Sequence, residues 1–166
     1  MIFKKNKFLS FFLIFSFLAI IILLININLN KVAKDKKKAK QPIIINLLTS
    51  VHPNLPWGFK AKESKIVMDV GEVRTIEYFV ENLANDATTG IATFAYFPKQ
   101  FGNYIKKLNC FCYDAQTLKP NQKDKFMVVL LIDPEVTNDS KTKNIKEVTI
   151  QFTFFDYKEY EKNQSS

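Results

Sequence analysis

From residue 43 onward, the chain consists of short runs rich in β-branched and aromatic side chains, and this pattern leaves few folds open. Apolar and polar residues alternate within several runs, and turn signals such as Lys119-Pro120-Asn121 separate them. No window has the 3.6-residue apolar period of an amphipathic helix. We therefore expect an all-β fold, an antiparallel two-sheet sandwich of immunoglobulin type. The expected strands are 43–51, 65–70, 73–82, 88–97, 104–113, 125–132 and 145–155.

The N-terminal part has a different pattern. Residues 8–25 are apolar apart from two serines, and about 20 such residues are enough to cross a bilayer as a helix. We predict a short tail over 1–7 and a single transmembrane anchor over 8–29. The alternative, a cleaved signal peptide, is less favoured because no small-x-small cleavage site follows; the nearest candidate, Ala33, has Lys31 two positions before it.

The positive charge of the chain is confined to one region. The net charge is +8, and residues 1–41 contain nine Lys and one Asp, so residues 42–166 are neutral. A neutral folded part lacks the basic surface that binds DNA or RNA, and we expect no nucleic-acid partner. The lysines instead indicate contacts with anionic lipid headgroups beside the predicted anchor.

The remaining boundaries follow from composition. We predict a Lys-rich linker over 30–42, a folded domain over 43–157 and a polar C-terminal tail over 158–166. More lysines follow the predicted anchor than precede it, which by itself favours a cytoplasmic location for the C-terminal side.

Cys110 and Cys112 are the two cysteines of the chain, and they stand one residue apart between aromatic residues. Soft thiolates bind Cu(I), zinc or iron–sulfur clusters. Two sulfur ligands are too few for a zinc or iron–sulfur site, so a lone Cys-x-Cys pair favours Cu(I). On one strand, the two side chains would share a face, with Cα atoms about 6.5 Å apart and Phe111 on the opposite face. An intrastrand disulfide at that spacing would be strained. From spacing alone, metal binding, redox pairing and simple packing all remain open.

Beyond the cysteines, the flanking residues carry a resemblance. The run from Tyr104 to Tyr113, with Cys-Phe-Cys followed by Gln-x-Leu-x-Pro, resembles the CtaG family of cytochrome c oxidase assembly proteins. The likeness extends over most of the folded domain. Its other segments are 55–59, 70–72, 90–93, 132–135 and 152–155.

The resemblance implies a membrane-anchored copper chaperone, not an enzyme. It implies one transmembrane helix, a cytoplasmic N-terminus and an immunoglobulin-like domain in the periplasm, against the lysine count; in a eukaryote, the domain would face the mitochondrial intermembrane space. Cys110 and Cys112 would bind Cu(I) from an upstream copper donor and pass it to the copper B centre of cytochrome c oxidase subunit I. A homodimer is implied for the copper-loaded form.

The chain departs from this family at two points. Many members carry a further cysteine after the membrane helix, where this sequence has lysines, and Tyr113 replaces the usual phenylalanine. Two rival functions stay open: a thiol-disulfide oxidoreductase that uses the same pair, and an adhesion or scaffold module. Lys106 and Lys107 either stabilise the thiolates or form a solvated edge. His52 is expected to be a loop residue, not a ligand.

Overall fold

The computed structural model describes residues 16–27 and 41–164, and the chain divides into two compact units, 1–40 and 41–166. Residues 16–27 form a helix. Among the described residues, no helix combines the length and the apolarity that crossing a membrane requires. The predicted tail 1–7, most of the predicted linker and the two ends of the predicted anchor lie outside the described residues.

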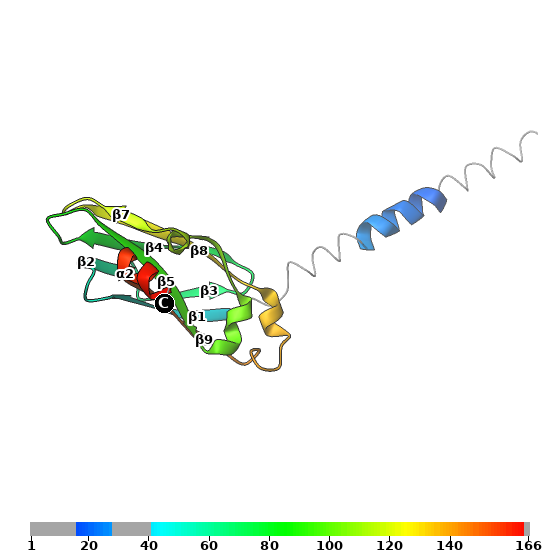
Figure 1. The fold of residues 1–166 in the computed structure, drawn as a ribbon. Coiled ribbons are helices and arrows are strands. Elements are labelled where there is room, and N and C mark those ends of the chain that lie inside the picture. Colours follow the sequence, from blue (N-terminus) through cyan, green and yellow to red (C-terminus); the bar gives the residue numbers. More distant parts are fainter. Residues whose placement is uncertain (1–15, 28–40, 165–166) are drawn as a thin grey trace, which may run out of the picture. The chain divides into compact units, whose positions relative to one another are not determined.

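The second unit is a sandwich of two β-sheets, which confirms the all-β prediction (Figure 1). One sheet has five strands in the order β3-β1-β9-β5-β7, and the other has four in the order β2-β4-β8-β6. The strands are β1 (Pro42–Val51), β2 (Trp57–Ala61), β3 (Lys65–Asp69), β4 (Val73–Asn82), β5 (Thr88–Phe97), β6 (Ile105–Cys110), β7 (Gln116–Leu118), β8 (Lys123–Ile132) and β9 (Glu147–Asp156).

Three helical turns and one helix complete the unit. The 3-10 turns are η1 (Lys99–Tyr104), η2 (Phe111–Tyr113) and η3 (Pro134–Thr137). The helix α2 (Tyr157–Gln164) occupies most of the stretch that we expected to be a polar tail. It contacts β5 and β9.

The structure corrects the strand prediction in three places. The sandwich is not fully antiparallel, because β1 pairs with β9 in parallel. Two strands were missed: β2 contains a glycine, and β7 is only three residues long. The predicted strand 104–113 is too long, since β6 ends at Cys110.

The core lies between the two sheets, and strand alternation builds it. In β4, every second side chain is buried, namely Ile76, Tyr78 and Val80, so one face of the strand points inward. Aromatic rings from both sheets meet there: Tyr78 lies 5.5 Å from Phe152 of β9, centroid to centroid. This aromatic core supports the segment that carries the cysteines.

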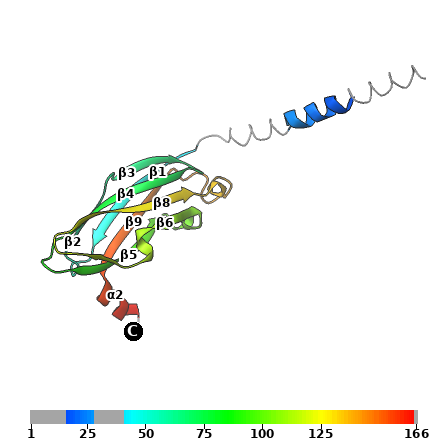
Figure 2. The same ribbon diagram turned by 90° about the horizontal axis from the view of Figure 1, so that it is seen from above.

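At one edge of the sandwich, the two sheets end in short strands, β6 and β7, and a 3-10 turn joins them. In the five-stranded sheet, β7 covers only residues 88–90 of β5, and in the other sheet β6 is the edge strand. β6 lies beside β8 (Figure 2), and from β6 the chain crosses to β7 through η2, which contacts β5. Both cysteines lie at this crossing between the sheets.

Candidate functional site

Cys110 and Cys112 lie at the end of β6 and in the turn that follows it. Cys110 is the last residue of β6, while Cys112 belongs to η2. The prediction that both side chains share one strand face is therefore wrong. The reason is visible in burial: Cys110 is 5% exposed and the next residue, Phe111, 8% exposed, and consecutive residues of a regular strand cannot both face the core.

The turn brings the two cysteines closer than a strand would. Their Cα atoms are 5.0 Å apart, against the expected 6.5 Å, and a disulfide joins them. The backbone N–H of Cys112 also donates to Cys110 Sγ at 3.2 Å. The two sulfurs thus meet at the border of the core, where Cys110 is buried and Cys112 is partly buried.

Phe111 anchors the turn in the core. Its ring is stacked on Phe126 at 5.3 Å and lies 4.9 Å from the ring of Phe152, so it contacts side chains from both sheets. Gln116 donates from Nε2 to the Phe111 carbonyl at 3.2 Å. The position of the cysteines is therefore fixed by the packing of the residue between them.

Lys107 is the charged side chain closest to the sulfurs. Its Nζ lies 3.5 Å from Cys112 Sγ and 4.4 Å from the centroid of the Phe94 ring. The ammonium also faces the ring of Tyr113 at 5.4 Å, and the hydroxyl of Tyr113 donates to the Lys107 carbonyl at 2.7 Å. Lys107 is thus held on three sides beside the disulfide.

A β-bulge explains why Lys107, and not its neighbour, reaches the sulfurs. Lys107 pairs with Leu130, whose side chain points into the core, so Lys107 faces the interior side of the sheet. The register shifts between Lys107 and Asn109, which leaves Leu108 as an extra residue. Lys106 points the other way and donates to the Asn103 carbonyl at 2.8 Å. Sequence alone left these two lysines equivalent because it does not show the bulge.

Burial affects the charge of Lys107. Desolvation lowers the pKa of its ammonium below the ordinary value. No ion pair between described residues includes Lys107. The site therefore holds a partly buried cation without a carboxylate partner, next to two sulfurs.

His52 and Trp57 contact aromatic residues of β9 and not the cysteines. His52 stacks on Phe155 at 5.5 Å, and its Nδ1 has no hydrogen-bond partner among the described residues. Trp57 packs on Phe154 at 5.0 Å and donates from Nε1 to Thr88 Oγ1 at 2.7 Å, an anchoring role in the core. In the part of the chain that the structure describes, no three His, Cys, Asp or Glu side chains are grouped to hold a metal ion.

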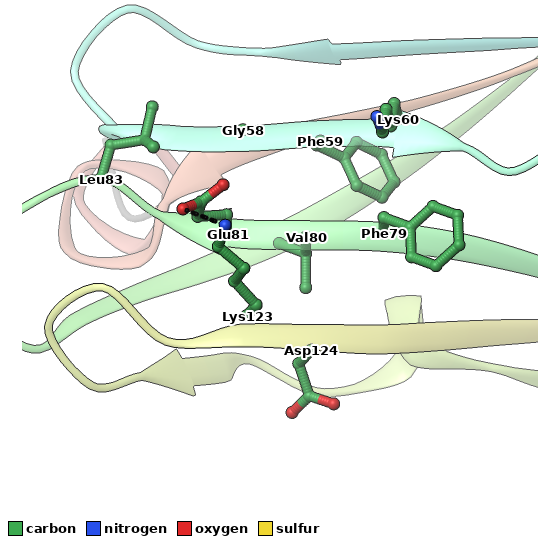
Figure 3. Close-up of a pocket in the computed structure, with 9 residues that line it drawn as sticks. All are labelled: Gly58, Phe59, Lys60, Phe79, Val80, Glu81, Leu83, Lys123 and Asp124. Atoms are coloured by element: carbon green, nitrogen blue, oxygen red, sulfur yellow. Dashed lines mark ion pairs between the residues drawn. The ribbon is translucent and has the colours of Figure 1, made fainter.

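A shallow hollow on the four-stranded sheet offers no comparable chemistry (Figure 3). It lies over β2, β4 and the start of β8, and two of the four charged side chains that line it form an ion pair: Lys123 lies 3.2 Å from Glu81. No cysteine or histidine lines it. The turn over residues 110–113, which we call the cysteine turn, is therefore the stronger candidate for a functional site.

Taken as chemistry, the turn offers two soft sulfur ligands and one cation. When the disulfide is reduced, the two thiolates can hold a small soft ion or attack another disulfide. Two sulfurs from one chain underfill a tetrahedral zinc site, whereas Cu(I) accepts low coordination numbers.

Comparison with known proteins places this site in a family. The family model described as cytochrome c oxidase assembly protein CtaG/Cox11 matches residues 23–156. Cytochrome c oxidase assembly protein CtaG from Nitrobacter hamburgensis is 35% identical over 78% of this chain and 60% of its own length. The protein of that name from Bradyrhizobium diazoefficiens is 34% identical over 70% of this chain and 55% of its own length.

A third relative is covered more fully. The CtaG protein from Ehrlichia ruminantium, strain Welgevonden, is 36% identical over 76% of this chain and 72% of its own length. The chain spans a little over half the length of the first two relatives. The matched range includes the whole cysteine turn and nearly all of the sandwich. The chain belongs to the CtaG/Cox11 family of cytochrome c oxidase assembly proteins.

Proposed function

We propose that this protein is a copper chaperone that delivers Cu(I) to the copper B centre of cytochrome c oxidase subunit I during oxidase assembly. The observation that carries the proposal is the close approach of the Cys110 and Cys112 sulfurs, in a turn whose backbone is held by the packing of Phe111. Membership in a family of oxidase assembly proteins supplies the biological setting. Copper is the cargo of this function, and the protein breaks and forms no substrate bonds as an enzyme does.

The disulfide is the resting form of such a site and must be opened before copper binds. A dithiol reductant would supply two electrons and two protons, and it would itself become a disulfide. Cu(I) would then displace the two protons as both sulfurs ligate it, which leaves a copper–bisthiolate of charge −1. Transfer to histidines of the acceptor would proceed by exchange of one ligand at a time.

The remaining parts of the proposal concern location and assembly. We infer a single membrane anchor over residues 8–29 and an immunoglobulin-like domain on the periplasmic side of the inner membrane. Anchoring would raise the effective concentration of the donor near a membrane-bound acceptor. A copper-loaded homodimer would pool four thiolates from two chains, and an upstream donor would supply the metal.

Anaerobic titration with Cu(I), in competition with a chromophoric chelator, tests the copper site. The pre-reduced wild-type chain should bind copper, and Cys110→Ser and Cys112→Ser should each lose most of that binding. Met127→Leu is the matched control, because it removes an exposed sulfur from the strand that pairs with Cys110. Equal copper binding by the wild type and the double cysteine variant would overturn the proposal.

Location and assembly need separate measurements. A periplasm-dependent reporter fused after residue 41 should be active, and a silent reporter would contradict the exported domain. Light scattering of the copper-loaded chain should give the mass of a dimer. A monomer that binds copper with full stoichiometry would contradict the shared site.

The alternative function, a thiol-disulfide oxidoreductase, is favoured by one observation: the two cysteines are joined in the structure. Repeated reduction of a disulfide substrate in the absence of copper, lost in Cys112→Ser, would support this alternative.

A further inference from the structure

Lys107 combines three properties that a solvated lysine does not have. It faces the interior side of its strand, and its ammonium lies 3.5 Å from Cys112 Sγ. The rings of Phe94 and Tyr113 flank the ammonium at 4.4 and 5.4 Å. Cation–π contacts of this kind hold a cation in place without neutralising it. The charge of Lys107 is thus directed at the sulfur pair and is not consumed by a carboxylate.

A positive charge in this position has little to interact with while the disulfide is intact. The disulfide is neutral, and no ion pair of the described residues satisfies Lys107. The situation changes when copper binds, since Cu(I) and two thiols give a copper–bisthiolate of charge −1 and two released protons. The negative charge then lies on the two sulfurs, one of which, Cys112 Sγ, is 3.5 Å from the ammonium in the disulfide form.

We propose that Lys107 is a positioning residue that compensates the negative charge of the copper–bisthiolate on Cys110 and Cys112, and so strengthens the retention of Cu(I). This inference rests on the proposed function, because it assumes that the pair binds Cu(I). The inference goes beyond that function in one respect: Lys107 interacts with Cys112 Sγ and is not itself a copper ligand. A hydrogen bond to a charged acceptor is stronger than one between neutral groups, and partial burial limits the screening by water.

The test compares four full-length proteins, reduced and kept anaerobic: wild type, Lys107→Met, Lys107→Arg and Lys106→Met. Lys107→Met keeps an unbranched stem of similar reach and removes the charge, whereas Lys107→Arg keeps the charge. Lys106→Met makes the same change in net charge one residue away, on the side chain that bonds to the Asn103 carbonyl. The measured quantity is the Cu(I) dissociation constant at one fixed pH, from competition with a chromophoric chelator.

We expect Lys107→Met to raise the dissociation constant roughly tenfold, in line with the loss of one charge-assisted hydrogen bond. The dissociation constant of Lys107→Arg should stay within about threefold of the wild-type value. That of Lys106→Met should equal the wild-type value. Equal affinities for wild type and Lys107→Met would overturn the inference, as would an equal loss in Lys106→Met. A wild type that fails to bind Cu(I) would instead overturn the proposed function, so the two failures are distinguishable.

Folding and ligation are checked on the same samples. Thermal unfolding of the oxidised forms should give closely similar midpoints for all four proteins, and Lys107→Gln replaces Lys107→Met if the latter unfolds. The ultraviolet charge-transfer band of copper–thiolate should keep its position in every variant that binds copper, because the ligands are unchanged. A shifted band in Lys107→Met would show that the lysine alters ligation and would contradict charge compensation.

Discussion

The two sides of the cysteine turn differ in almost every physical respect. On the inner side, Phe111 is 8% exposed and packs against rings from both sheets. On the outer side, Tyr113 is 54% exposed and Cys112 is partly buried, and the ammonium of Lys107, which extends from the interior side of β6, lies by the rings of Phe94 and Tyr113. The inner side is packed with aromatic rings, whereas the outer side carries a charge and a more exposed ring.

This difference separates positioning from chemistry. A reactive pair on a surface loop would lose precision through motion, and a pair inside the core would be out of reach. Here Phe111 and the buried Cys110 connect the turn to the core, while Cys112 is only partly buried, so the backbone of the pair is held and one of its two cysteines lies nearer the surface. Substitutions on the inner side should therefore change stability, and substitutions on the outer side should change chemistry.

Removal of the anchor is the strongest test of this separation. Phe111→Ala should lower the free energy of unfolding by about 3–5 kcal/mol, because a large buried ring is lost and a cavity remains. Urea denaturation of the full chain measures the change. Phe97→Ala, which truncates a ring that is 70% exposed, is the control and should stay within about 0.5 kcal/mol of wild type. If both substitutions lowered the free energy of unfolding equally, the inner side of the turn would not differ from an exposed surface in its contribution to stability.

A second substitution tests the inner side in the opposite direction. The Tyr78 hydroxyl is buried and has no hydrogen-bond partner among the described residues, and burial raises its pKa. Tyr78→Phe should therefore raise the free energy of unfolding by about 1–2 kcal/mol, since an unsatisfied buried hydroxyl is removed and the ring is kept. A loss of stability in the same denaturation experiment would show that the hydroxyl has a partner, such as a buried water.

The two cysteines allow a finer test of the difference between the two sides of the turn, because Cys110 is buried and Cys112 is only partly buried. Under reducing conditions no disulfide contributes, and Cys110→Ser should cost about 1 kcal/mol more than Cys112→Ser, since it places a hydroxyl at a position that is only 5% exposed. Denaturation in the presence of a phosphine reductant gives the difference. The reverse order would place Cys112, not Cys110, on the packed side.

The smallest expected effect concerns Asp139, which accepts a hydrogen bond from Tyr104, the residue before β6. The N–H of Lys141 and the Tyr104 hydroxyl both donate to the Asp139 carboxylate and lower the pKa of that carboxyl. A lowered pKa contributes stability above the unfolded-state value, and the contribution is lost as the pH falls through the folded-state value. Asp139→Ala should therefore melt slightly below wild type at pH 7.

The same pair of proteins provides the pH test. The difference in melting temperature should narrow as the pH falls below about 4, because the wild-type carboxylate becomes protonated and loses its advantage. Melting curves at several pH values measure this. A difference that stays constant into acid would show that the hydrogen bonds of Asp139 do not depend on its charge.

Much of the sandwich could be predicted from the alternation of side chains. β4 and β5 have the predicted bounds, because long strands with one buried face repeat every second residue. β7 was missed because three residues are too few to show a period. The parallel pairing of β1 with β9 could not be predicted, since pairing direction depends on partners far apart in the sequence.

The residues of the candidate site could be chosen from the sequence, but their geometry could not be predicted from it. Cys110 and Cys112 were selected by chemistry, which sequence shows directly, and the structure brings them together. The turn that begins at Phe111 could not be predicted, because a ring that fits the core overrides the local strand pattern. The distinction between Lys106 and Lys107 depends on a bulge that has no signal in the local sequence.

The parallel pairing of the first and last strands has a consequence for how this domain comes into being. Asn46 of β1 donates to Glu147 of β9, across 101 residues of chain. β9 lies between β1 and β5 in its sheet but follows both in the chain, so during synthesis these two strands lack the partner that joins them. Until the last strand emerges, β1 and β5 present open edges that invite pairing with other chains. The cysteine turn contacts β5, and its Phe111 packs on Phe152 of β9, so the packing around the two cysteines is complete only after β9 has joined the sheet.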